Sequence, residues 1–476
     1  MFINTLFLVL LTQGVVSLSV YLDRRSPRSV FRPSSEEYSV RKSDKSRLIL
    51  TPLIESGNLS EARNLSRVSG GPFSKDVLSY SGFFTVNETH NSNMFFWFFP
   101  AEKRYETAPV ILWLQGGPGA SSLYGLFEEI GPYKISETTK TSLIMNPYSW
   151  HKDHSLLFID NPVGTGFSFT ENEGFVRNQT QVGSQLYDAL IQFFTMFPEL
   201  QDLPFYIAGE SYAGKFIPAV GYTIHKRNPK AELKINLQGL AVGNGFTDPI
   251  SMISRSHLLF QLGLIDSYSY QEMKNTEEGC KQLILTEKYM EALECWYENV
   301  KIFTRETTYK NEYNFMKPER IDLTKKLDYF LKQDDVRSAL HVGDILFSES
   351  GFDVMMNMRM DKMKSVKPWL EELLEHYRVL YYSGQLDIIV AYSMSVNMYN
   401  SLNFSAAEEY RIASREPWFV DGELAGYMKS AGKFTEVLVR NAGHMVPADQ
   451  PKWALDLINR FTHDNLLRST SRVNFT

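Results

Sequence analysis

The stretch PFYIAGESYAGKFIPAV, residues 204–220, places Ser211 directly between two short apolar runs. Residues 205–209 form a compact apolar run of the kind found in buried strands, and the apolar residues from Ala213 onward recur at helical spacing. A turn this short between a strand and a helix strains its central residue, and it needs small residues two positions before and two positions after. Gly209 and Ala213 meet that need, so the stretch predicts a strand, a sharp turn at the serine and a helix.

Two interpretations of Ser211 are open at this point. Serine often caps a helix, and a cap would carry no chemistry. The alternative is a nucleophile held out at the turn, although the usual motif has glycine at both flanking positions and Ala213 departs from it. A serine hydroxyl is a weak nucleophile that needs a base, usually histidine, and an acid that orients the base. The choice therefore depends on whether such partners follow in the chain.

Both partners can be assigned from the order of the elements. Where a nucleophile follows a strand in this way, the acid and then the histidine come from loops at the ends of later strands. His444 lies in the loop RNAGHMVPADQP directly after an apolar run, whereas the other histidines that follow the serine lie in helical stretches. Asp387 follows the preceding apolar run in the same manner. We therefore predict that Ser211, His444 and Asp387 form one hydrogen-bonded row.

The fold class follows from short apolar runs that recur along the chain, separated by helical stretches. Such runs, with little alternation, are what a mostly parallel sheet buried on both faces requires. Before them, SYSGFFTVNETHNSNMFFWFFPA has two aromatic-rich runs around a polar turn, which predicts an antiparallel hairpin. We expect a three-layer α/β sandwich with helices on both faces of the sheet. The expected strands are 110–114, 156–160, 205–209, 237–243, 379–384 and 436–440.

The length of 476 residues, 43% of them hydrophobic, is enough for one large domain with an insertion. The start, MFINTLFLVLLTQGVVSLSV, is interpreted as a signal peptide, because a membrane anchor needs about 20 apolar residues. After the run at 237–243 the strand pattern stops, and a charged, helical segment follows that indicates an inserted cap. The expected divisions are 1–19 signal peptide, 20–47 flexible leader or prosegment, 48–255 first part of the core, 256–368 helical cap, 369–466 second part of the core and 467–476 C-terminal tail.

Several features favour the secretory route. The two cysteines, Cys280 and Cys295, are 15 residues apart, and in an oxidising compartment such a pair is most simply a local disulfide. Asn-x-Ser/Thr sites fit an exported glycoprotein. The net charge of −6, without a long block of like charges, makes nucleic acid a poor partner. The candidate glycosylation sites are Asn58, Asn64, Asn87, Asn178, Asn403 and Asn474.

Several long motifs resemble those of one family, the serine carboxypeptidases, and within it most closely the vitellogenic carboxypeptidase-like branch. The motifs LWLQGGPGASS, IDNPVGTGFSF, GESYAGKFIPA, LAVGNGFTDP, SGQLDIIV and NAGHMVP occur in the family's order, and the match covers about residues 78–461. The resemblance implies the α/β-hydrolase fold. It also implies that Ser211 is the nucleophile, Asp387 the orienting acid and His444 the general base. No cofactor or metal is expected.

The loop QGGPGASS supplies glycines where a backbone must approach a ligand closely. On its own this segment could be a plain Gly-Pro turn. With the serine turn beside it, the N–H groups of Gly117 and Tyr212 are the expected oxyanion hole, the donors that stabilise the charge on the attacked carbonyl.

An exopeptidase must also hold the free C-terminal carboxylate of its substrate. The resemblance implies that Gln115, Gly116, Glu129 and Glu210 do so, with the two glutamates sharing one proton. Two touching carboxyl groups cannot both ionise cheaply, so the pair holds a proton in acid and donates it to the substrate in a hydrogen bond. We therefore expect an acidic optimum for peptides.

Three functions are weighed on these residues. The first is a serine carboxypeptidase, secreted or lysosomal and either a monomer or a homodimer, that acts on peptides with a free C-terminus. The second is an acyltransferase with the same triad, and the third is a catalytically silent storage or binding protein. Two departures from the wider family, Gln115 for asparagine and Ala120 for cysteine, bear on substrate preference and leave the chemistry intact.

Overall fold

The computed structural model describes residues 46–317, 319, 323–348 and 351–463. The expected signal peptide, most of the expected leader, the C-terminal tail and Asn474 lie outside these ranges and stay predictions.

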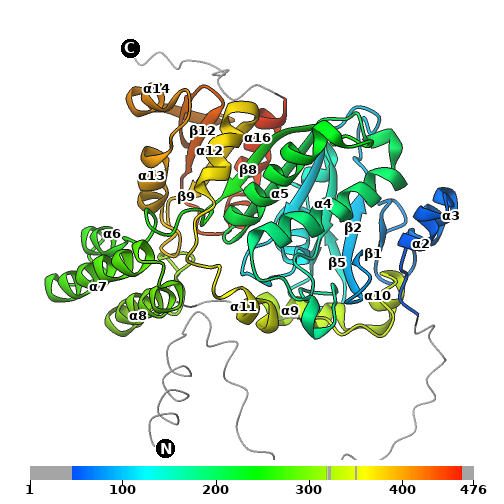
Figure 1. The fold of residues 1–476 in the computed structure, drawn as a ribbon, viewed down its shortest axis with the longest axis horizontal. Coiled ribbons are helices and arrows are strands. Elements are labelled where there is room, and N and C mark those ends of the chain that lie inside the picture. Colours follow the sequence, from blue (N-terminus) through cyan, green and yellow to red (C-terminus); the bar gives the residue numbers. More distant parts are fainter. Residues whose placement is uncertain (1–45, 318, 320–322, 349–350, 464–476) are drawn as a thin grey trace, which may run out of the picture.

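A ten-stranded sheet runs through the molecule in the order β1-β2-β6-β3-β7-β8-β9-β12-β11-β10 (Figure 1). Its central strands, from β6 to β12 in that order, are parallel, and they are the six strands expected from the apolar runs. β1 and β2 form the predicted antiparallel hairpin at one edge. The strands are β1 Tyr80–Asn87, β2 Ser92–Phe99, β3 Val110–Leu114, β6 Ser155–Ile159, β7 Phe205–Glu210, β8 Leu237–Gly243, β9 Arg378–Gly384, β10 Glu416–Val420, β11 Glu423–Ala431 and β12 Phe434–Val439. A separate small sheet pairs β4 Tyr133–Ile135 with β5 Leu143–Met145.

The hairpin of β10 and β11 at the other edge is not predicted by the apolar pattern. β10 begins with the exposed residues Glu416 and Pro417, and β11 mixes buried with partly exposed positions. A strand that is solvated on one face lacks the continuous apolar run on which the other strands were recognised. The available signal is the turn at Asp421 and Gly422, where both residues have a positive φ, as a tight hairpin turn requires.

Helices cover both faces of the sheet, as expected for the predicted sandwich (Figure 1). Leu112 and Leu114 of β3 pack into one core with α4 and α5, whereas Ile111 and Trp113 pack into a second core with α16 on the opposite face. This alternation explains why the central strands are apolar at nearly every position. The core helices are α2 Thr51–Glu55, α3 Leu59–Ser66, α4 Gln179–Met196, α5 Ala213–Arg227, α12 Lys367–His376, α13 Tyr392–Ser401, α14 Ala407–Ile412, α15 Val446–Asp449 and α16 Pro451–Thr462.

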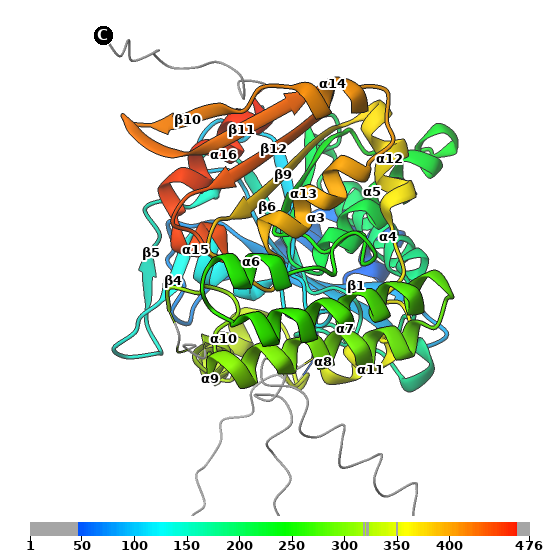
Figure 2. The same ribbon diagram turned by 90° about the vertical axis from the view of Figure 1, so that its left-hand side faces the viewer.

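The segment between β8 and β9 is largely helical. Helices α6, α7 and α8 form one group that stands beside the sheet, with α7 and α8 side by side (Figure 2). The predicted disulfide is present and joins Cys280 of α7 to Cys295 of α8. The helices of this segment that precede α12 are α6 Ser256–Gln261, α7 Ser267–Leu285, α8 Tyr289–Thr307, α9 Leu323–Leu331, α10 Asp334–Ala339 and α11 Phe352–Met358. Within the described ranges, no helix combines the length and apolar character that a membrane crossing needs.

Candidate active site

Ser211 occupies the turn between β7 and α5, as its sequence context predicts. Its φ is +62°, a conformation that residues other than glycine rarely adopt. Backbone hydrogen bonds hold the turn, because Ser211 N–H donates to Gly243 O at 3.0 Å and Phe246 N–H donates to Ser211 O at 2.9 Å. The strained conformation is thus fixed by the neighbouring strand β8 and the loop that follows it, which is typical of a residue held for function rather than of a simple helix cap.

Asp387 and His444 are in contact at the ends of β9 and β12. The Nδ1 atom of His444 lies 2.7 Å from Asp387 Oδ2, and both side chains are buried. The other oxygen of Asp387 accepts hydrogen bonds from the N–H groups of Ile389 at 2.9 Å and Val390 at 3.3 Å. These bonds fix the carboxylate, and the carboxylate in turn fixes the orientation of the imidazole.

The opposite nitrogen of the ring, His444 Nε2, is buried and has no hydrogen-bond partner among the described residues. The expected bond between this nitrogen and the hydroxyl of Ser211 is therefore not made in the substrate-free chain, and only two members of the predicted row are joined. Catalytic hydrogen bonds are often long without substrate and tighten only when it binds, so this geometry does not remove His444 as the base.

Asn244 is a residue of this site that the sequence reasoning missed. Its Nδ2 donates to Asp387 Oδ2 at 2.7 Å, on the same oxygen that faces His444, and its Oδ1 accepts from Gly384 N–H at 3.1 Å. The side chain is fully buried and φ is +42°, a region in which asparagine is enriched. The available signal was its position in GNG directly after β8, where a loop at the end of a core strand meets its neighbours.

The loop after β3 lies against the serine turn. A Cβ atom at Gly116 would lie 2.5 Å from the backbone nitrogen of Tyr212 and 2.7 Å from the Cβ of Ser211, so only glycine fits there. Gly117 has a φ of +108°, which also favours glycine. Among the described residues, neither Gly117 N–H nor Tyr212 N–H donates to another group. Both predicted oxyanion donors therefore have an unused hydrogen on adjoining segments.

Asp160, directly after β6, anchors the far end of this loop. Its Oδ1 accepts from Ser121 Oγ at 2.5 Å and from Ser122 N–H at 3.0 Å, and its Oδ2 accepts from Phe167 N–H at 2.8 Å. Burial raises the pKa of Asp160 to about 7, although these donors oppose the shift. Its carboxyl group ties two glycine-containing loops together beneath the site, a role that the sequence reasoning did not assign.

Gln115, Glu129 and Glu210 meet beside the turn, as the resemblance implies. The amide Nε2 of Gln115 donates to Glu210 Oε1 at 2.7 Å and lies 3.4 Å from Glu129 Oε1, and all three side chains are buried. Trp113 Nε1 donates to Gln115 Oε1 at 2.9 Å, which fixes the orientation of the amide. The Oε2 atoms of both glutamates have no hydrogen-bond partner among the described residues.

The two glutamates have a strong electrostatic reason to share a proton. Burial raises the pKa of Glu129 to about 8. Burial, and then the negative charge of Glu129, raises the pKa of Glu210 well above its ordinary value. Because two adjacent buried carboxylates repel and cannot be solvated, the pair retains at least one proton in acid.

Glu129 is placed by a π-helix, Gly125–Ile130, that follows the glycine loop. This helix packs closely on the sheet, because a Cβ atom at Gly125 would lie 2.1 Å from the indole nitrogen of Trp113. On its outer side, the buried Lys326 of α9 pairs with Glu128 at 2.9 Å. Single-turn π-helices are frequent at functional sites, and here the geometry turns one of two consecutive glutamates towards Glu210 and the other towards the cap.

Comparison with known proteins finds similarity to serine carboxypeptidases over most of the chain. The family model described as serine carboxypeptidase matches residues 71–464. A venom serine carboxypeptidase of Apis mellifera is 51% identical, covering 88% of this chain and 91% of the relative. A vitellogenic carboxypeptidase of Aedes aegypti is 47% identical, covering 88% and 90%. Among solved structures, a prohormone-processing carboxypeptidase from Saccharomyces cerevisiae has a TM-score of 0.75 at 24% identity, covering 84% of this chain and 96% of its own.

Proposed function

The chain belongs to the serine carboxypeptidase family, and on that premise we propose that Ser211 is its nucleophile, His444 its general base and Asp387 the acid that orients the base. The hydrogen bond between His444 and Asp387 supports these roles, because it holds the imidazole with Nε2 available to take a proton. The strained turn at Ser211 supports them as well.

In the proposed reaction, Ser211 Oγ attacks the carbonyl carbon of the last peptide bond while its proton passes to His444 Nε2. The N–H groups of Gly117 and Tyr212 stabilise the negative oxygen of the tetrahedral intermediate. His444 then gives the proton to the departing amine, the C–N bond breaks and one amino acid leaves. Water attacks the acyl-enzyme with His444 again as base, which releases the shortened peptide and restores the serine.

Selection for the end of the peptide is proposed to come from the glutamate pair. A neutral carboxyl group in the pair donates a hydrogen bond to the terminal carboxylate of the substrate, and Gly116 lets that carboxylate approach the backbone. Gln115 already donates to Glu210, so its amide is proposed to orient the pair. The buried pair beside the nucleophile is the observation that carries the proposal, because transfer of an acyl group to an alcohol has no need of it.

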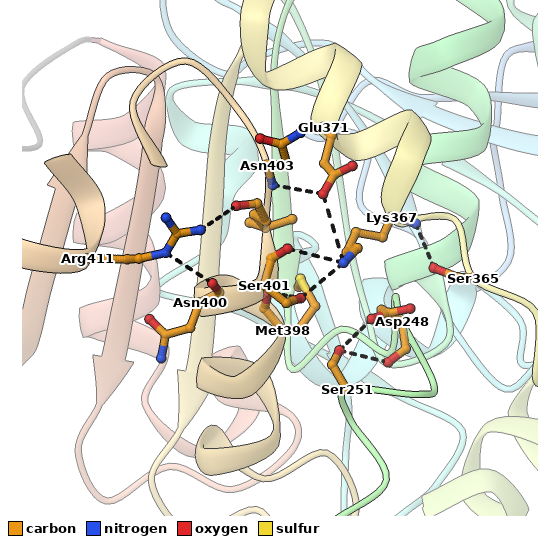
Figure 3. A network of polar contacts seen from close by, with 11 residues as sticks. Asp248, Ser251, Ser365, Lys367, Glu371, Met398, Asn400, Ser401, Asn403 and Arg411 are labelled. Carbon is orange, nitrogen blue, oxygen red and sulfur yellow. Dashed lines mark hydrogen bonds and ion pairs between the residues drawn. The ribbon is translucent and has the colours of Figure 1, made fainter. Parts of the chain in front are cut away.

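The destination of the protein is proposed to be the secretory pathway, ending outside the cell or in the lysosome. The disulfide between Cys280 and Cys295 and the Asn-x-Ser/Thr sites support this. Asn403 is exposed, its backbone N–H donates to Glu371 at 2.8 Å, and its side-chain amide has no hydrogen bond within the described chain (Figure 3). Asn58 and Asn64 are exposed as well, whereas Asn87 and Asn178 are half-buried.

The proposal is tested with purified protein and N-blocked dipeptides at pH 5.5. The wild type is expected to release the C-terminal amino acid, and Ser211→Ala is expected to lose at least about a thousandfold in kcat. The same peptides with an amidated C-terminus serve as the test of end selection and should be much poorer substrates. Equal hydrolysis by wild type and Ser211→Ala would show that Ser211 is not the nucleophile.

A further inference from the structure

The guanidinium group of Arg255 is buried, and no hydrogen bond or ion pair joins it to a carboxylate of the residues that the structure describes. The side chain is 1% exposed and lies in the loop between β8 and α6. Its Nε and Nη2 atoms are buried and have no hydrogen-bond partner among the described residues. The neighbouring carboxylate of Glu277 is already engaged, because it accepts from the backbone N–H groups of Arg255 and Ser256 and from the hydroxyl of Ser256, each at 2.8 Å. A guanidinium does not lose its charge in proteins, and buried donors are normally hydrogen-bonded. The unpaired Nε and Nη2 donors of Arg255 therefore indicate a place for an acceptor from a bound molecule.

A second cation lies on the same aromatic ring. The Cζ of Arg255 is 5.3 Å from the centre of the Trp296 ring, and the Nζ of Lys362 is 4.6 Å from it. Lys362 is 9% exposed, and its Nζ lies 3.5 Å from the hydroxyl of Tyr297. The indole attracts each cation, but two cations on one ring repel each other in a region of low dielectric. An anion between them would relieve the repulsion and satisfy the idle donors.

This group of three, Arg255, Trp296 and Lys362, adjoins the catalytic residues. Lys362 follows Asp361, whose Oδ2 is 3.5 Å from the hydroxyl of Tyr212, the residue after the nucleophile. Lys215 in the first turn of α5 donates to the backbone carbonyls of Asp361 at 2.9 Å and Lys362 at 2.8 Å, so this segment is attached to the nucleophile's own helix.

Arg255 borders the catalytic residues from another direction. It follows β8 in the chain, and three carboxylates lie close enough to act on the charge of its guanidinium, Glu312 most strongly, then Glu277 and then Asp387. The group of three therefore lies next to the site rather than in a remote part of the cap.

The order of the strands indicates which part of a substrate would reach the group. Gln115 follows β3, Ser211 follows β7, and Asn244 follows β8, which is the neighbour of β7 on the side away from β3. The carboxylate-binding residues thus lie on the β3 side of the nucleophile, and Arg255 comes from the β8 side. A peptide with its last residue against Gln115 and its last peptide bond at Ser211 extends its penultimate residue towards the β8 side.

We infer that Arg255 and Lys362, arranged around Trp296, form a subsite for the side-chain carboxylate of a penultimate Asp or Glu in the peptide substrate. The inference rests on the proposed peptidase function and adds a substrate class to it. The acceptor oxygens of the substrate would take the idle Nε and Nη2 donors of Arg255, in the side-on geometry that a guanidinium offers to a carboxylate. Lys362 would add a second positive charge without a fixed geometry.

The test compares two N-blocked dipeptides, one with Glu and one with Gln before a C-terminal Phe, at pH 5.5, where the Glu side chain is ionised. Because Gln has the same shape without the charge, the ratio of kcat/KM for the two peptides isolates the carboxylate. A charge-assisted hydrogen bond predicts a ratio of about 10 to 100 in favour of Glu for the wild type. Arg255→Gln and Lys362→Met should each bring the ratio towards one while the Gln peptide is still hydrolysed.

Lys364→Met is the matched control, because Lys364 lies two residues from Lys362 but is exposed to solvent, and it should keep the wild-type ratio. Hydrolysis of the Gln peptide in the same sample shows that each variant is folded. A wild-type ratio near one with good hydrolysis of both peptides overturns the subsite and leaves the peptidase function standing. Hydrolysis of neither peptide by the wild type overturns both, and a ratio unchanged in both variants also overturns the subsite.

Discussion

Asn244 contributes to the site through one hydrogen bond to the oxygen of Asp387 that faces His444. We expect Asn244→Gly to lower kcat by about 10- to 100-fold, the effect of losing one hydrogen bond to a charged group. Glycine tolerates the positive φ at this position, so the backbone and KM should change little. Steady-state kinetics with a blocked dipeptide measure kcat and KM, and a wild-type kcat in Asn244→Gly would contradict this positioning role.

The proton shared by Glu129 and Glu210 predicts the alkaline limb of the same profile. The protonated pair binds the substrate, so the competent form is complete below the raised pKa of the pair and is lost as the pH rises through it. We expect kcat/KM for peptides to be higher at pH 5.5 than at pH 8.5. In Glu129→Gln the amide is a donor at every pH, so the alkaline fall should flatten. A fall of the same size in Glu129→Gln would assign the limb to another group.

At the scale of elements, the site depends on how closely the loop after β3 approaches the turn between β7 and α5. We expect Gly116→Ala to lower kcat by at least about a hundredfold, because its Cβ would lie 2.5 Å from the nitrogen of Tyr212 and would move an oxyanion donor. Gly279→Ala is the matched control, since a Cβ atom at this position in α7 meets nothing within 4 Å. Hydrolysis and thermal unfolding are measured on both variants. Full activity in Gly116→Ala would contradict the proposed oxyanion hole.

At the scale of the whole molecule, buried histidines make the folded chain less stable in acid. Burial lowers the pKa of His154 to about 4, and its ring is held by the carbonyl of Trp150 at 3.1 Å and the hydroxyl of Thr462 at 2.8 Å. Because the folded pKa lies below the unfolded value of about 6.5, the stability it contributes is complete above pH 6.5 and is lost as the pH falls towards 4. The glutamate pair has the opposite sign, because its pKa is raised in the folded chain: the stability it contributes is complete below the unfolded pKa of about 4.3 and is lost as the pH rises through the raised pKa.

We expect His154→Gln to reduce the difference in Tm between pH 7 and pH 4.5. In acid the wild-type ring binds a proton on unfolding, which favours the unfolded chain, and glutamine does not bind one. The exposed His257→Gln is the control and should keep the wild-type difference. Differential scanning calorimetry at the two pH values measures the effect. The same loss of Tm in acid for wild type and His154→Gln would show that burial of this ring does not set the acid limit of stability.

Much of the fold could be predicted from local pattern, because a strand covered on both faces must be apolar along its length. That reason holds for the six central strands and fails for β10 and β11, which are partly exposed to solvent. In the candidate site, Ser211 could be predicted because it follows a strand in a recognisable turn, and the disulfide partners were predicted from their spacing. Asn244 was missed, because an asparagine in a loop has no local signature of its partners.

The amino-acid sequence by itself determined the strand and helix pattern, the sharp turn at Ser211 and the family, since each depends on residues near one another in the chain or on long motifs. Only the tertiary structure decided which polar groups touch. Gln115 meets Glu210 across 95 residues, and Asn244 meets Asp387 across 143. Such contacts arise because neighbouring parallel strands end at one edge of the sheet, and the order of strands in the sheet, which differs from their order in the chain, selects the loops that meet.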